Sequence, residues 1–189
     1  MEINPRRTAL LSMDFHRALV ASSQMAQQRD LVNKVRSAQE AARQSGITVI
    51  HVGVRSRPGF ISPRNKFVNM IRSRGPAPSP DAMKTVEELE PVGDEPEIIK
   101  PRVNAFYGSE LELLLQSRDI DTLVLMGVTT EMVVESTARQ AMDSDYRVIV
   151  LEDCCASSQQ AYHDNSILVM DRMAEISNSQ EFVQTLEGA

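Results

Sequence analysis

The chain has 189 residues, a length that predicts one compact domain with a sizeable hydrophobic core. Apolar residues make up 42% and charged residues 24%, a composition that excludes an intrinsically disordered chain. Lys and Arg number 20 against 26 Asp and Glu, and this net charge of −6 argues against nucleic acid and anionic membranes as partners.

The start of the chain and its two cysteines indicate a cytoplasmic protein. The first apolar run, residues 9–13, is interrupted by Asp14 and is too short for a signal-peptide core or a membrane span. The cysteines are adjacent, Cys154 and Cys155, so they form neither a disulfide framework nor a pair of CxxC metal clusters. We therefore expect a protein of the reducing cytoplasm that is neither exported nor membrane-bound.

The predicted elements alternate between strands and helices along the chain. Branched aliphatic residues fill residues 9–14 and 47–54, which is typical of strands buried on both faces. Between them, residues 31–45 repeat apolar positions at three- and four-residue steps and end at Gly46, which predicts a helix. The same alternation continues with strands at 97–100, 122–127 and 147–152 and helices at 109–117, 130–142 and 158–175. The pattern predicts βαβ units, hence an α/β domain with a central, mainly parallel sheet and helices on both faces.

Residues 55–96 differ from the rest because seven of the nine prolines fall there. So long a stretch without regular structure is usually functional in a compact domain, and we expect a lid or binding loop with short helices near 65–72 and 81–89. A disordered insertion is the alternative. The loop does have apolar side chains to bury: Phe60, Phe67, Val68, Met70 and Ile71.

Three candidate functional segments follow predicted strands. In an open parallel sheet the ligand site lies beyond the carboxyl ends of the strands, where helix N-termini also point their N–H groups. Asp14 ends the first strand, Lys100 ends the short EIIK strand, and residues 127–133 (GVTTEMV) lead into a helix. We expect all three to meet at one edge of the sheet.

These segments resemble a known family. Asp14 after an aliphatic strand, KPRVNAF from Lys100, and GVTTEMVVESTARQAMDSDYRVIVLEDCCAS from Gly127 are similar to the isochorismatase-like, or cysteine hydrolase, superfamily. IHVGVRSRPGFISPRN, residues 50–65, also resembles a loop of bacterial members. The resemblance covers nearly the whole chain and is most specific over residues 100–157. It implies a single three-layer, Rossmann-like hydrolase domain over residues 1–189.

The resemblance implies a catalytic triad of Asp, Lys and Cys. Asp14 would transfer the proton. Lys100 would keep the Asp14 carboxyl group ionised and would polarise the substrate. A thiolate would attack a carbonyl or nitrile-like carbon. The pattern G-x-x-T-x-x-C-V puts that nucleophile at residue 133, which here is Val133. Valine has no lone pair and no titratable proton, so thiol chemistry at this position is excluded. Losing such a nucleophile costs roughly 10⁴ to 10⁶ in turnover in other enzymes.

The rest of the implied site is present. The resemblance places an oxyanion hole at the backbone N–H groups of Thr129 and Val133, with a non-proline cis peptide between Val128 and Thr129. Backbone donors do not depend on the side chain they carry. Siderophore and phenazine isochorismatases of the superfamily also lack the cysteine and hydrolyse a vinyl ether with the acidic residue as proton donor, although they have glycine where this chain has Val133.

The three histidines have different interpretations. His16 stands where the family commonly has glutamine, so it is either a candidate catalytic group or a histidine that supports the site. His51 lies in a predicted buried strand and is expected to be a hydrogen-bonded core residue, whereas His163 on a helix is expected to be exposed. No zinc-binding Asp-x-His-type loop is visible near His51, so we expect neither a metal nor another cofactor.

Other polar and aromatic residues are ambiguous. Cys154 and Cys155 are expected to be buried apolar filler, with a replacement nucleophile as the alternative. Thr129 and Thr130 are more simply helix-capping residues than nucleophiles. The candidate substrate-binding residues, which could instead pack a subunit interface, are Phe60, Arg64, Asn65, Phe106 and Tyr107.

Two functions are open at this point. The first is a hydrolase acting on a small amide, carbonyl or vinyl-ether substrate without a cysteine nucleophile, in a homo-oligomer (dimer or tetramer), with water as the attacking species. The second is a catalytically silent relative that serves as a small-molecule binding or assembly subunit. An open cavity between Asp14 and Lys100 would favour the enzyme, and a cavity plugged by Val133 against Phe106 would favour the silent protein.

Overall fold

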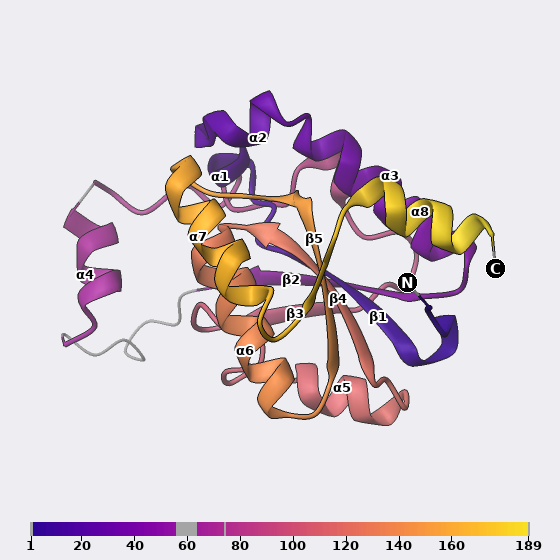
Figure 1. Ribbon diagram of the computed structural model, residues 1–189. Helices are drawn as coiled ribbons and strands as arrows, with labels where there is room; N and C mark the ends of the chain where they lie inside the picture. The colour runs from indigo at the N-terminus through magenta and orange to yellow at the C-terminus, as the bar shows by residue number, and fades with distance from the viewer. Residues whose placement is uncertain (1, 56–63, 74, 189) are drawn as a thin grey trace.

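The computed structural model describes residues 2–55, 64–73 and 75–188 (Figure 1). Its centre is one six-stranded sheet in the order β3-β2-β1-β4-β5-β6, in which all neighbouring strands are parallel. The strands are β1 (Thr8–Met13), β2 (Thr48–Val54), β3 (Glu97–Lys100), β4 (Thr122–Val128), β5 (Arg147–Ala156) and β6 (Glu175–Ser177). The predicted mainly parallel sheet is confirmed. None of the helices in the described ranges is long and apolar enough to cross a membrane.

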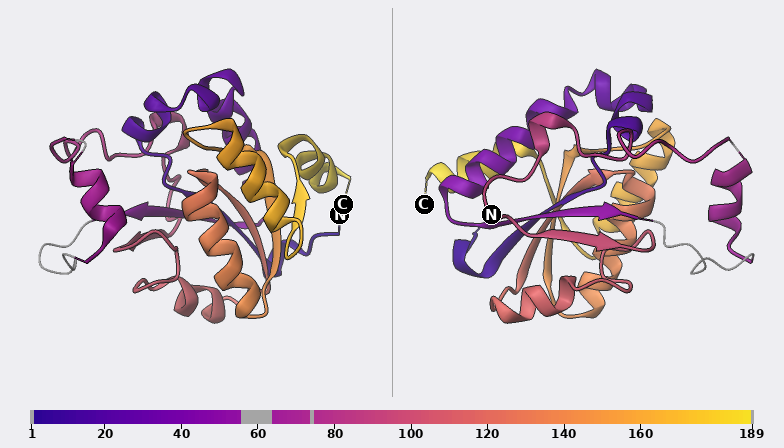
Figure 2. Two further views of the ribbon diagram at one scale, coloured as in Figure 1. Left: turned by 60° about the vertical axis from the view of Figure 1, so that its left-hand side comes forward. Right: turned by 180° about the vertical axis from the view of Figure 1, so that it is seen from behind.

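The central strands of the sheet are mainly apolar because the sheet is covered on both faces. Successive strand residues point to opposite faces, so Leu10 and Val124 belong to one core cluster and Leu11 and Leu125 to the other. One face packs against α2 (Gln24–Gln28), α3 (Leu31–Gln44) and α8 (Ser179–Glu187), and the other against α5 (Leu111–Ser117), α6 (Glu135–Asp143) and α7 (Gln160–Met170). Figures 1 and 2 show the resulting three layers, which confirm the predicted sandwich.

The C-terminal part differs from its prediction. The expected helix over 158–175 ends at Met170 as α7, and a turn then leads into the short strand β6. β6 exists because it pairs with β5 at the edge of the sheet, with Glu175 opposite Ile149. A three-residue strand has too little pattern of its own to be detected in the sequence.

Three further helices had no counterpart in the predictions. They are α8 and two short helices after β1, namely α1 (Arg17–Ser22) and α2. A single turn of 3-10 helix, η1 (Pro5–Arg7), precedes β1.

The long segment between β2 and β3 is partly helical. The predicted helix near 65–72 is present as α4 (Lys66–Ser73), which stands away from the body of the molecule in Figure 1 and in the right panel of Figure 2. The predicted helix near 81–89 is reduced to one turn, η2 (Glu87–Leu89). The reason is tertiary: Thr85 forms an antiparallel bridge with His16, and the Val86 N–H donates to the Phe15 carbonyl oxygen, which holds this stretch extended.

Candidate functional site

Asp14 and Lys100 form a buried ion pair at the carboxyl ends of β1 and β3. The Lys100 Nζ donates to Asp14 Oδ2 at 2.7 Å, and the two residues are only 1% (Lys100) and 6% (Asp14) exposed. Asp14 has a left-handed backbone (φ 55°), and its N–H donates to the Val52 carbonyl oxygen of β2, which lies between β1 and β3. Asp and Asn tolerate this conformation better than most residues. The turn therefore directs the carboxylate back across β2 toward the ammonium group.

His16 lies against the other oxygen of the carboxylate. The buried imidazole places Nε2 3.5 Å from Asp14 Oδ1, and neither that oxygen nor either ring nitrogen has a hydrogen-bond partner among the described residues. A buried polar atom without a partner costs about 1 to 3 kcal/mol. The arrangement therefore leaves an unpartnered carboxylate oxygen and an unpartnered imidazole facing each other.

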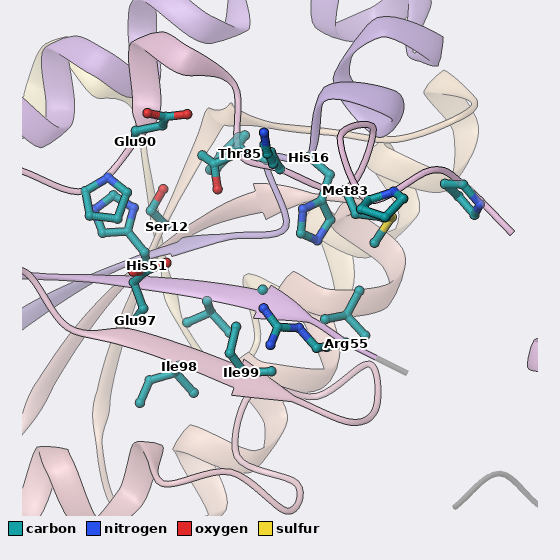
Figure 3. A pocket seen from close by; sticks show the side chains of 18 of the residues that line it. Ser12, His16, His51, Arg55, Met83, Thr85, Glu90, Glu97, Ile98 and Ile99 are labelled. Carbon is teal, nitrogen blue, oxygen red and sulfur yellow. The ribbon is translucent and has the colours of Figure 1, made fainter. Parts of the chain in front are cut away.

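A cavity of about 870 Å³ opens beside His16 (Figure 3). Its walls come from β2 and β3 and from the segment 77–91 that passes above them, and they include Ser12, His51, Arg55 and Thr85. Asp14 and Lys100 are not among the lining residues, so His16 is the residue that connects the cavity to the ion pair.

His51 has a structural role in this wall. Its ring is buried, and its Nε2 lies 2.9 Å from Glu95 Oε2. Burial is the largest effect on this imidazole and lowers its pKa, although the hydrogen bond to Glu95 opposes the shift. The expectation of a hydrogen-bonded core histidine is confirmed.

Val133 lies in the apolar core on the α6 side of the sheet. Its side chain is buried in the cluster that contains Met13 and Ala105, against which Phe106 also packs. The residue is part of η3 (Thr130–Val134), a single π-helical turn at the start of α6. Its N–H donates to the Thr129 carbonyl oxygen at 3.1 Å, so an oxyanion would have to share that donor. The peptide bond between Val128 and Thr129 is cis, as the resemblance implies.

The predicted substrate-binding residues do not gather around the cavity beside His16. Phe60 lies outside the described residues. Arg64 and Asn65 precede α4, where Asn65 Oδ1 accepts from the Val68 N–H. Phe106 and Tyr107 line a separate, shallower cavity of about 590 Å³.

The loop after Lys100 turns away from the ion pair toward α6. Asn104 Nδ2 donates to the Ser136 carbonyl oxygen of α6 at 2.7 Å. The Phe106 ring lies against the Tyr146 ring, with 6.1 Å between the ring centroids. These contacts explain why Phe106 and Tyr107 are not found beside His16.

The prediction that His163 is exposed is wrong. The side chain is buried and links α7 to η3, since its Nδ1 lies 2.9 Å from Thr130 Oγ1. On its other side, Nε2 lies 3.0 Å from Arg29 Nη1 and 3.4 Å from Glu152 Oε2. Nothing in the helical pattern of α7 distinguishes this position, because the partners come from η3, from the end of α2 and from β5.

The two cysteines are unsuited to nucleophilic duty. Both are free, both are fully buried, and both lie in β5. Burial raises the pKa of Cys154 well above its ordinary value and raises the pKa of Cys155 to about 12. At neutral pH both therefore remain thiols, in agreement with the expected role as apolar filler.

The cavity also contains residues that no sequence signal identified. Ser12 and Thr85 line it but belong to no motif, and Gly53 and Arg55 lie in the stretch 50–65 without having been singled out there. The signals that indicated a functional loop in this region were the resemblance of residues 50–65 and the change of composition at residue 55. Within the described ranges, no three His, Cys, Asp or Glu side chains lie close enough together to hold a metal ion.

Comparison with known proteins gives a consistent result. The family model for the isochorismatase domain matches residues 8–181. The uncharacterised isochorismatase family protein YecD of Escherichia coli O157:H7 is 31% identical over 98% of this chain and 100% of its own length. The ureidoacrylate amidohydrolase RutB of Acinetobacter baylyi is 25% identical over 99% of this chain and 86% of its own. A cysteine hydrolase from Pseudomonas syringae pv. phaseolicola, 22% identical, superposes with a TM-score of 0.88 over 100% of this chain and 96% of its own.

Proposed function

The chain belongs to the isochorismatase family, and from this premise we propose that it hydrolyses a small amide, carbonyl or vinyl-ether substrate without a cysteine nucleophile, using Asp14 and Lys100. The proposal is supported by the relatives, among which RutB is named an amidohydrolase of ureidoacrylate. It is also consistent with the polar groups at the carboxyl ends of β1 and β3.

One observation carries the proposal. Asp14 uses one carboxylate oxygen to accept from Lys100 at 2.7 Å, and its other oxygen lacks a partner among the described residues and faces His16 Nε2 at 3.5 Å. His16 in turn lines the cavity. A carboxylate with a free oxygen is a base, and a water molecule admitted beside this oxygen would be oriented by the carboxylate and by the imidazole. Water then takes the place of the missing thiolate.

For an amide substrate the steps balance without an external reagent. The water oxygen forms a bond to the carbonyl carbon while its proton moves to Asp14 Oδ1. The developing negative charge on the carbonyl oxygen is stabilised by the Thr129 N–H and by the positive charge of Lys100. Asp14 then gives the proton to the amide nitrogen, the C–N bond breaks, and a carboxylic acid and an amine leave.

Lys100 has the capacity for this second duty. An ammonium group has three N–H donors. Two of them are used by Asp14 Oδ2 and the Arg102 carbonyl oxygen, at 2.7 and 3.2 Å. A vinyl ether would instead require Asp14 to act as a proton donor, whereas Asp14 Oδ2 is an acceptor for Lys100, so an amide or carbonyl substrate fits better.

The test is a hydrolysis screen with ureidoacrylate, isochorismate and small amides. We expect turnover of at least one of them, and Asp14→Asn should lower kcat by about 10² to 10⁴ because an amide oxygen is a poor base. Asp143→Asn, a change of an exposed aspartate at the end of α6, is the matched control and should retain full activity. Undiminished turnover in Asp14→Asn would remove Asp14 from the mechanism.

A specific observation also favours the second candidate, a catalytically silent binding subunit. The ion pair is covered rather than open to the cavity, and Val133 is buried within the core. In that case calorimetric titration with ureidoacrylate would register binding to the wild-type protein, while product analysis of the same samples would find no hydrolysis.

A further inference from the structure

Helix α4 is the one element that Figures 1 and 2 show clear of the sheet and its covering layers. It has eight residues, and isolated helices shorter than about 12 to 15 residues are marginal in water. Its apolar side chains Phe67 and Val68 are only half-buried, and Met70 is 39% exposed. A short helix with an apolar side needs a surface to pack on.

The charge of this part of the chain indicates what that surface is. Residues 64–73, the basic segment, contain Arg64, Lys66 and Arg72 and no Asp or Glu. The rest of the chain then has 17 Lys and Arg residues against 26 Asp and Glu residues, a net charge of −9. The positively charged segment that projects from one copy is therefore electrostatically complementary to the negatively charged body of a second copy.

The anionic counterpart lies in residues 87–97, the acidic segment, which holds six Asp and Glu residues and no Lys, Arg or His. Four of the six are exposed and make no ion pair with any residue in the described part of the chain: Glu87, Glu88, Asp94 and Glu97. Next to them, Val92 is 58% exposed, so the segment also offers an apolar contact.

Both segments lie beside the same cavity. Arg55, from which the chain leads on to α4, lies toward one end of it, and Glu90 and Glu97 lie toward the other (Figure 3). Ala77 and Pro78, which follow the basic segment, also line it. In a two-fold symmetric pair each copy presents the same patch to the other. Here α4 lies toward one end of the cavity and the acidic segment toward the other, so one patch of the chain contains both halves of the contact that a symmetric pair needs.

We propose that α4 of one copy docks on the acidic segment of a second copy, reciprocally, and that each copy thereby closes the mouth of the other's cavity. The inference concerns assembly and does not depend on the hydrolase activity. Its consequence for the site is that the cavity beside His16 is enclosed only in the dimer.

The test measures the dimer dissociation constant of the full chain by sedimentation equilibrium. Lys66→Glu alters α4, and the double variant Glu87→Lys/Glu88→Lys alters the acidic segment. A symmetric dimer contains the contact between α4 and the acidic segment twice, so each change places like charges against each other at two contacts. We therefore expect a dissociation constant at least about tenfold higher than that of the wild type. Raising the salt concentration should weaken the wild-type dimer as well.

Mixing the two variants gives the decisive comparison. In the mixed dimer the glutamate introduced at position 66 of one chain would face the two lysines introduced into the acidic segment of the other. The second contact would join the unaltered α4 of one chain to the unaltered acidic segment of the other. Opposite charges would therefore face each other at both contacts. We expect the mixture to form a heterodimer with an affinity near that of the wild type.

Two matched variants control for charge reversal on exposed helices outside the proposed contact. Arg118→Glu lies at the end of α5, and Glu187→Lys lies in α8. Each changes the net charge by the same amount as a single reversal in the contact. Both should leave the dimer intact.

Any of four results would overturn the inference. The first is a wild-type chain that stays monomeric at micromolar concentration, and the second is a dimer that tolerates both charge reversals. The third is failure of the mixed variants to associate although circular dichroism shows both to be folded. If Lys66→Glu leaves the dimer unchanged but abolishes binding to a polyanion such as heparin, the basic segment serves a polyanion and not a second copy.

Discussion

Residue 133, where the resemblance implies a cysteine nucleophile, is a valine in this chain. The side chain at this position is a buried valine, in a cluster with Met13 and Ala105. Unpartnered polar atoms are instead found at Asp14 and His16, which face each other behind the part of the cavity wall that His16 forms. The proposed hydrolysis therefore uses water as the nucleophile in place of a side chain at residue 133.

Val133→Cys tests whether the cavity reaches this position. The substitution changes the volume only slightly, so we expect a folded protein destabilised by about 1 kcal/mol. Burial at this position would keep the new thiol protonated, as it does for Cys155. We therefore expect no amide hydrolysis and no labelling of the introduced thiol by iodoacetamide, as measured by mass spectrometry.

The wild-type protein is the control for this experiment, because Cys154 and Cys155 are fully buried and should stay unlabelled in the native state. Rapid labelling of the variant at residue 133, or a gain of amidase activity, would contradict the closed position described above. It would also mean that the rest of a thiol-dependent site is still in place.

At the scale of elements, the contact between β1 and β4 sets the geometry of the site. Gly127 of β4 lies opposite Met13 of β1, one residue before Asp14. A Cβ at Gly127 would lie 2.7 Å from the Met13 carbonyl oxygen and 3.0 Å from the Met13 Cβ. Backbone atoms in the centre of a sheet cannot move aside, so a glycine is required for this close approach.

Gly127→Ala is accordingly expected to lower the free energy of unfolding by about 1 to 3 kcal/mol. Gly53→Ala in β2 is the matched control, since its added Cβ would meet only the edge of the His16 ring at 3.4 Å and the Ile99 side chain at 3.9 Å. We expect a loss below about 1 kcal/mol there. Urea unfolding followed by circular dichroism measures both, and equal losses in the two variants would contradict this account of the β1–β4 contact.

At the scale of the whole molecule, Glu95 joins parts of the chain that are distant in sequence. Its carboxylate accepts from Arg43 of α3 at 2.7 and 3.0 Å and from the Val92 N–H at 2.9 Å, and it lies 2.9 Å from His51 Nε2 of β2. Burial acts to raise the pKa of Glu95, but these hydrogen bonds together outweigh it and lower the pKa from 4.5 to about 2. The carboxylate form is thus specifically favoured by folding.

This difference predicts an acid-dependent loss of stability. The folded pKa lies below the unfolded one, so the contribution of Glu95 is present above pH 4.5 and is lost as the pH falls through about 2. The expected size is on the order of 1 to 3 kcal/mol, at the lower end because the carboxylate is partly exposed to solvent. Protonation of His51 in the unfolded chain acts in the same direction, because burial lowers its folded pKa.

Glu95→Gln should therefore be less stable than the wild type at pH 7 and show a shallower decline between pH 4.5 and 2. The measurement is the midpoint of urea unfolding as a function of pH. Glu187→Gln, a change of an exposed residue at the end of α8, should retain the wild-type profile. Parallel profiles for wild type and Glu95→Gln would mean that Glu95 contributes nothing to acid stability.

The regular part of the fold follows directly from local pattern. Continuous branched aliphatic runs predicted β1, β2, β4 and β5, because a strand covered on both faces has no polar side, and the helical period of residues 31–45 predicted α3. The positions of Asp14, Lys100 and the turn before α6 at strand ends also placed them at one edge of the sheet, since parallel strands end on the same side.

Other features were decided only by contacts between distant segments. β6 needs β5 to pair with, residues 85–86 are held extended by residues 15–16, and His163 is buried by partners from three other elements. The same holds for the unpartnered Asp14 and His16 atoms and for the cavity beside them.

Sequence by itself determined the central strands β1, β2, β4 and β5, the long helix α3 and the placement of Asp14 and Lys100 at strand ends, because these depend on neighbours within a few residues. The tertiary structure alone decided which polar atoms face the cavity, because that depends on packing between segments tens of residues apart.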